Sequence, residues 1–233
     1  MYSRIINGNE HTFGVSGKLI RNALGMYDHQ TDTLWSQLLG EAVQGELSGT
    51  KLEVLPAMMT TWEEWKTIHP DTLAIQKGFV GNWDAYSGYY TSSDEGVLGV
   101  EQSDDRLGAK EFVIGVNLGQ DAVAYPFGVL DRELVVNDLI NDVPAVVVFD
   151  SDTATGVVWK RNLADGRLLT FTADEGENIR DLETGTLWNG FSGQAITGEL
   201  AGEKLKQIPS TLVFWFAWFD FHPATRLYGH DQE

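Results

Sequence analysis

Hydrophobic residues occur along this chain in short runs separated by polar, glycine-rich stretches, and this pattern predicts mainly β-structure. The run at 143–149 is apolar and rich in valine, which is typical of a buried strand. Shorter apolar runs predict further strands at 112–116, 168–172 and 52–55. We therefore expect a protein built from short strands.

Two further stretches, 42–49 and 195–202, carry regularly spaced glycines and predict short strands that end in tight turns. The region 77–107 is polar and turn-like, so it is interpreted as a connector.

Two short helices are also predicted. Thr61 and Glu64 fit a capping box, so a helix is expected from 62 to about 69, where Pro70 follows. Trp62, Trp65 and His69 then share one face of that helix. A matching helix near 215–222 is apolar nearly all round, which predicts that it is buried.

An internal repeat organises the chain. Residues 28–73 align without a gap to residues 181–226 at an offset of 153, with 19 identities in 46 positions. The shared frame begins D-x-x-T-x-T-L-W and ends W-x-x-W-x-x-x-H-P-x-T. The repeat predicts a β-rich α+β fold with two homologous lobes related by a pseudo-twofold axis. The expected division is 1–76 for the first copy, 77–123 for the connector and 124–233 for the second copy.

The two copies are unequal. The segment 124–150 of the second copy has no counterpart in the first, because shifting it back by 153 lands before residue 1. The first copy is thus expected to be incomplete at its N-terminal side, through truncation or through asymmetric design. It would complete its sheet by borrowing the strand at 143–149 or by pairing with another chain, as in a homodimer, since an open apolar edge invites aggregation.

Charge and composition narrow the range of partners. The formal charge is −18, which argues against nucleic acid and against an anionic membrane surface. A salty environment would screen the self-repulsion, which favours the hypothesis of a marine or halophilic source. The absence of cysteine excludes disulfides and thiolate chemistry within the chain. No transmembrane run and no secretory signal at the start are recognisable, so the protein is expected to be soluble, and exported if a signal was removed upstream.

The motifs taken together resemble those of the bacterial and archaeal domain-of-unknown-function family 3179. The resemblance rests on TFGVSGKL (12–19), MYDHQTDTLWSQ (26–37), TTWEEWKTIHPDT (60–72), YSGYY (86–90), AYPFGVL (124–130), VVND (135–138) and FWFAW (214–218). The family implies a duplicated domain without a settled activity. Its members carry a Cys-Pro-Leu-Cys stretch before the TFGVSG motif, which this chain lacks, and Val147 to Asp150 stand at the equivalent place in the second copy. If the cysteine pair serves a metal or redox function, that function would belong only to a longer protein that contains the pair.

The repeated polar and aromatic residues each have a structural and a functional interpretation. Asp28 and Asp181 suit a general acid or base, but an Asx-type turn is favoured because both copies keep the residue. The repeated tryptophans suit a ligand-stacking wall, but a core role is favoured. His69 and His222 could share a metal ion, but no further ligands stand at a recognisable spacing, so no metal site is predicted. The favoured interpretation is structural, because a histidine at the C-terminus of a helix interacts favourably with the helix dipole.

Positions that differ between the copies are better candidates for a ligand site. The candidate ligand site lies around such positions and comprises Asn22, Tyr27, Asp28, Gln37 and His69. Tyr27 and Gln37 differ from their second-copy counterparts and Asn22 stands in a spacer that the second copy does not match, whereas Asp28 and His69 occur in both copies. The second candidate pair is Asn137 and Asp138, which also suits an ordinary turn.

Two functions follow from these observations. The first is a binding or interaction module for a small molecule or a protein partner, favoured because no catalytic or nucleotide-binding motif is present. The alternative is an enzyme of unknown class with a polar site around Asn22, Asp28 and Gln37. The sequence names no cofactor.

Overall fold

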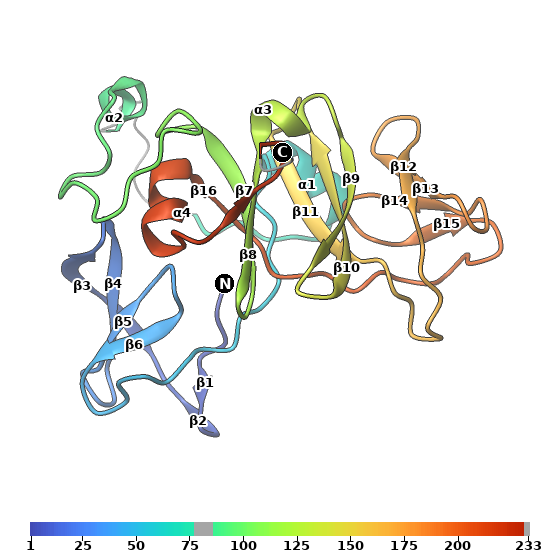
Figure 1. The fold of residues 1–233 in the computed structure, drawn as a ribbon. Coiled ribbons are helices and arrows are strands. Elements are labelled where there is room, and N and C mark those ends of the chain that lie inside the picture. The colour runs from blue at the N-terminus through green and yellow to red at the C-terminus, as the bar shows by residue number, and fades with distance from the viewer. Residues whose placement is uncertain (77–85, 231–233) are drawn as a thin grey trace.

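The structure is a computed structural model that describes residues 1–76 and 86–230, and it is rich in β-structure with a few short helices (Figure 1). The strands of the N-terminal part are β1 (Ile5–Ile6), β2 (Asn9–Glu10), β3 (Phe13–Ile20), β4 (Ala23–Asp28), β5 (Leu34–Ser36) and β6 (Glu41–Gln44). The later strands are β7 (Phe112–Leu118), β8 (Asp121–Pro126), β9 (Val135–Ile140), β10 (Val143–Asp150), β11 (Thr155–Lys160), β12 (Phe171–Ala173), β13 (Asn178–Asp181), β14 (Leu187–Asn189), β15 (Ala195–Thr197), β16 (Thr211–Phe214) and β17 (Arg226–Leu227). The helices are α1 (Trp62–Ile68), α2 (Ser87–Thr91), α3 (Phe127–Leu130) and α4 (Trp215–Phe221).

Two sheets form the middle of the molecule. One has the strand order β16-β7-β8-β17 and the other β11-β10-β9. They pack face to face around a core that contains Ile114, Tyr125 and Val147. Because successive side chains of a strand point to opposite faces, Val146 and Val148 of β10 lie on the other face of the second sheet, in a different buried cluster. The prediction of a buried strand at 143–149 is therefore confirmed, with burial on both faces.

The four-stranded meander β12-β13-β14-β15 covers the outer face of the β9–β11 sheet. Figure 1 shows it at one end of the molecule, with the corresponding meander β3-β4-β5-β6 at the opposite end. Trp188 and Ile179 are buried between the second meander and β10. The first meander has a smaller core, which contains Ile6, Trp35, Ala42 and Leu52.

Helix α4 covers the outer face of the β7–β8 sheet, and six of its seven residues are buried. Gly115 of β7 faces Trp218, and a Cβ at this position would lie 2.3 Å from the indole Cε3. The close approach of helix and sheet thus requires glycine here. The predicted buried helix near 215–222 is confirmed, and so is the predicted helix at 62–69, where Thr61 accepts a hydrogen bond from the Glu64 backbone at 3.2 Å.

Several expectations need correction. Residues 52–55 form no ladder, only an isolated bridge between Val54 and Tyr2. The strand expected at 168–172 covers 171–173, because Leu168 forms only an isolated bridge to Asn162 and the ladder begins at Phe171. Strand β10 pairs with β9 and β11, so the first meander does not borrow it. Part of the expected connector, 77–85, lies outside the described residues, and α2 occupies a short stretch of the remainder.

Candidate functional site

Asp28, the first residue of the repeated frame, is fully buried and closes a turn. Its carboxylate accepts hydrogen bonds from the Thr31 backbone N–H at 2.8 Å and from the Trp35 indole N–H at 2.9 Å. The Thr31 hydroxyl donates to the same carboxylate, and His11 Nδ1 lies 3.2 Å away. These contacts confirm the turn interpretation and leave Asp28 no exposed oxygen for chemistry on a ligand.

Asp181, at the end of β13 in the second meander, repeats the arrangement. It accepts from the Thr184 backbone N–H at 2.6 Å and from the Trp188 indole N–H at 2.9 Å. The same spacing occurs a third time at the β10–β11 turn, where the Thr153 hydroxyl donates to Asp150 at 2.6 Å. Sequence reasoning missed this third D-x-x-T-x-T stretch, although its spacing was a sufficient signal.

The turn at Asp28 predicts an acid-sensitive contribution to stability. Burial raises the pKa of the carboxyl group, but hydrogen bonds from Trp35, Thr31 and His11 outweigh burial and lower the pKa from 3.8 to about 2. A lowered folded-state pKa gives stabilisation that is complete above the unfolded value and is lost as the pH falls from about 4 towards 2, an effect of about 2 kcal/mol. Urea unfolding of wild type and Asp28→Asn across this range should give curves that converge at low pH. Parallel curves would contradict the assignment.

The ends of α1 and α4 share a second repeated arrangement. The Trp65 indole donates to the Thr72 hydroxyl at 2.9 Å, and His69 packs on the Trp65 ring at 4.3 Å. The His69 side chain is exposed at the helix C-cap, away from the other candidate residues. At the C-cap of α4, His222 packs on Trp218 with 4.2 Å between the ring centres, and burial lowers the pKa of His222 to about 4.

Asn137 and Asp138 hold strands together. The Asn137 amide donates to the Phe171 carbonyl at 2.7 Å and accepts from the Phe171 N–H at 2.9 Å. Asp138 accepts hydrogen bonds from the Tyr125 hydroxyl at 2.6 Å and from Arg226 Nη2 at 2.7 Å. Burial, followed by the neighbouring Asp138 carboxylate, raises the pKa of Tyr125. Both side chains are therefore engaged within the fold.

The remaining candidates divide between two places. Tyr27 lies on β4 with its ring over Gly14 and near His29, outside the cavity described next. Asn22 lines that cavity, but its amide accepts from the backbone N–H groups of Val97 and Leu98 and donates to the Gly99 carbonyl at 2.6 Å. Asn22 thus fastens the 97–99 loop to the β3–β4 turn.

Gln37 lines the same cavity as Asn22, so the structure brings these two candidates together. The Gln37 backbone carbonyl accepts a hydrogen bond from the Tyr2 hydroxyl at 2.6 Å. Its amide side chain is exposed and, within the described part of the chain, makes no hydrogen bond. Gln37 therefore has an amide available to a ligand at the rim.

The cavity itself lies between the first meander and the β16–α4 unit, and its volume is about 580 Å³. Met26 and Leu38 line it from the first meander, whereas Leu212 and Phe214 line it from β16 and Ala217 lines it from α4. Aspartate, glutamate, lysine, arginine and histidine are all absent from its lining as far as the structure describes the chain. A mostly apolar cavity of this size with few polar groups is typical of a binding site.

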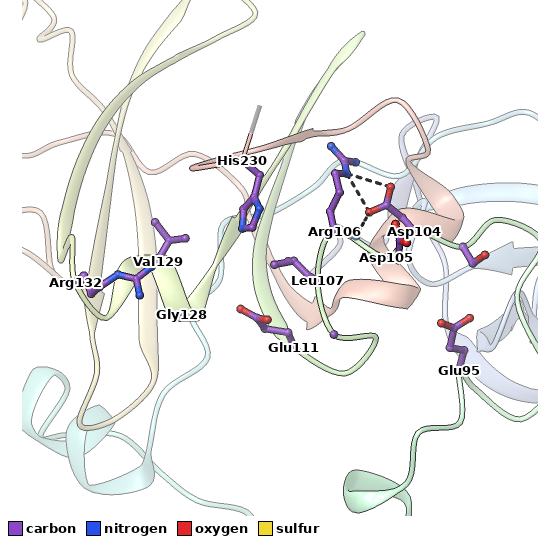
Figure 2. Close-up of a pocket in the computed structure, with 12 residues that line it drawn as sticks. Glu95, Asp104, Asp105, Arg106, Leu107, Glu111, Gly128, Val129, Arg132 and His230 are labelled. Carbon is purple, nitrogen blue, oxygen red and sulfur yellow. Dashed lines mark hydrogen bonds and ion pairs between the residues drawn. The ribbon is translucent and has the colours of Figure 1, made fainter. Parts of the chain in front are cut away.

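A second depression, of about 900 Å³, is polar (Figure 2). Figure 2 shows Arg106 directed at Asp104, to which its Nε donates at 3.0 Å, while Glu95 lies apart from this pair. The Arg106 guanidinium also lies 5.5 Å from the centre of the Trp215 ring. Because Arg106 is engaged by a carboxylate and an indole, this depression offers a weaker case for a ligand site than the apolar cavity.

Among residues 1–76 and 86–230, no group of three or more histidine, aspartate or glutamate side chains is placed to hold a metal ion. No helix in these same ranges is both long and apolar enough to cross a membrane.

The fold and the cavity thus define a β-rich protein with a mostly apolar cavity between the first meander and the β16–α4 unit. The family model described as "Protein of unknown function (DUF3179)" matches residues 1–225, and the chain belongs to this family. No curated protein and no solved structure matches the chain.

Proposed function

We propose that the protein is a binding module and that the apolar cavity between the first meander and the β16–α4 unit is its ligand site. The observation that carries the proposal is the half-buried state of Met26 and Leu38, which face the cavity where a core would normally continue. Their second-lobe counterparts, Ile179 and Phe191, are only 1% and 5% exposed. Covering the first pair with an apolar ligand would remove apolar surface from water, which favours binding.

The chemistry of the lining sets the class of ligand. Because none of the described side chains in the lining is charged and the Gln37 amide is available, the site suits an uncharged, largely apolar group that carries a hydrogen-bonding function. The enzyme alternative has less support, because the Asp28 carboxylate is enclosed and the Asn22 amide is engaged by backbone groups. The matched contacts of Asp28 and Asp181 support the further view that the two lobes arose by internal duplication and are related by a pseudo-twofold axis.

Filling the cavity should weaken binding of an uncharged, apolar fluorescent probe such as N-phenyl-1-naphthylamine. Ala217 is the one residue of α4 that is not buried, and it lines the cavity. Replacing Ala217 with tryptophan is expected to raise the dissociation constant of the probe about tenfold or more, as loss of one well-packed contact does. Fluorescence titration provides the measurement.

The matched control is Ala201→Trp, because Ala201 is exposed in the turn after β15, far from the cavity lining. This variant should bind the probe as wild type does. Equal affinities for wild type and both variants would place the probe elsewhere and remove the support for the cavity as the ligand site.

A further inference from the structure

We infer that the ligand of this cavity is an extended β-strand of a partner protein, bearing branched aliphatic side chains at alternate positions and pairing with the backbone of Tyr2. The inference rests on the proposed function of the cavity and names its occupant. It is drawn from the second lobe, where the equivalent place is filled by strand β10 of the chain itself.

Tyr2 in the first lobe stands where Trp159 of β11 stands in the second. The Trp159 indole N–H donates to the Gly190 carbonyl at 2.6 Å, and the Tyr2 hydroxyl donates to the Gln37 carbonyl, also at 2.6 Å. Gln37 is the counterpart of Gly190 at the repeat offset of 153. Both rings therefore sit on the same turn of their respective meanders.

On one side, the backbones around Tyr2 and Trp159 pair with equivalent segments of the chain. In the second lobe the Lys160 N–H donates to the Lys206 carbonyl at 2.8 Å, and Trp159 bridges to Gln207. In the first lobe the Ser3 N–H donates to the Glu53 carbonyl at 2.9 Å, and Tyr2 bridges to Val54. Residues 1–3 thus form the first-lobe counterpart of β11.

The other side of the two backbones differs. Trp159 is paired with Val146 of β10 in the antiparallel register of the β9–β11 sheet. Because the flanking residues bond to the 206–208 segment, the N–H and C=O of Trp159 itself point towards β10. Within residues 1–76 and 86–230, the N–H and C=O of Tyr2 have no hydrogen-bond partner. Tyr2 therefore presents an open strand edge, which is the template for strand addition.

The side chains required of the added strand follow from the same comparison. Val146 and Val148 pack in one buried cluster with Ile179 and Phe191. The first-lobe counterparts of Ile179 and Phe191, at the same offset, are Met26 and Leu38 in the cavity. A strand with two valine-like side chains two residues apart would cover them as β10 covers their counterparts. The charge of −18 further favours a partner with basic residues beside this strand.

The test uses a labelled peptide with the sequence of residues 143–150, flanked by lysines for solubility, titrated against the full chain by fluorescence anisotropy. Val146 of the peptide should pair with Tyr2, so methylating the backbone nitrogen at Val146 is expected to weaken binding about tenfold, as loss of a hydrogen bond does. Methylation at Val147 is the matched control, because that N–H points away from Tyr2, and it should leave the affinity unchanged.

A substitution in the protein completes the test. Leu38→Lys should abolish peptide binding, whereas Leu39→Lys should not, since Leu39 is exposed outside the cavity lining. If the fluorescent probe binds but the peptide does not, or if both methylated peptides bind equally, the strand partner is overturned while the cavity stands as a site for small ligands. If neither binds, both proposals fail. Self-association of the chain that competes with the peptide would identify a second copy as the strand donor and overturn a distinct partner.

Discussion

Replacing Asp181 with alanine is expected to lower the free energy of unfolding by about 4 kcal/mol, because it leaves buried donors without an acceptor. The carboxylate accepts hydrogen bonds from the Thr184 N–H, the Thr184 hydroxyl and the Trp188 indole. Asp181 and Trp188 have no exposed surface, so water cannot replace the lost acceptor. Urea denaturation followed by tryptophan fluorescence and circular dichroism measures the effect.

Two further variants sharpen that experiment. Trp188→Phe keeps most of the ring volume but removes the indole N–H, so it should recover part of the loss when combined with Asp181→Ala. Asp165→Ala is the control, since Asp165 is an exposed residue paired with Arg167, and its removal should change the free energy of unfolding by less than about 0.5 kcal/mol. An Asp181→Ala variant as stable as this control would show that the turn does not depend on its carboxylate.

The repeated frame allowed the local structure to be predicted well, because its residues make local contacts. The turn at Asp28 needs only residues that lie within seven positions of it, apart from His11. The valine-rich composition of β10 likewise predicted that this strand is buried. Such features depend on hydrogen bonds between residues close in the chain and on local hydrophobicity, and both can be predicted from the sequence.

The cavity could be predicted only in part, because it is formed by segments far apart in the chain. Asn22 and Gln37 were chosen for their difference between the copies, and both line the cavity. Met26 and Leu38 carry no polar signal and were missed, and so was Tyr2, whose role becomes visible only beside Trp159. Which strand covers which meander is a matter of tertiary packing, and no local pattern encodes it.

The tryptophans show the same limit within a single repeated motif. Trp62 and Trp215 occupy the same position of the frame, and the sequence favoured a core role for both. Trp215 is fully buried against the β7–β8 sheet, so its core role is confirmed. Trp62 is 51% exposed, so its core role is wrong. The reason is that α4 is covered by its neighbours over nearly its whole surface, whereas none of the residues of α1 is buried.

This difference predicts very unequal costs for the same substitution at equivalent positions. Trp215→Ala should lower the free energy of unfolding by about 4 kcal/mol, because it opens a large cavity beneath α4. It also removes the ring on which Arg106 lies and the indole N–H that donates to the Asp104 carbonyl at 3.2 Å. Trp62→Ala should cost less than about 0.5 kcal/mol, since the side chain is already half in water.

Thermal and urea unfolding of the two variants beside wild type measure both values under one set of conditions. Trp215→Phe is a second variant at the same site. Because it retains an aromatic ring, it should lower the free energy of unfolding by less than the alanine variant does. Similar losses for Trp62→Ala and Trp215→Ala would mean that the Trp62 side chain is buried in solution, which would contradict the exposed position of α1.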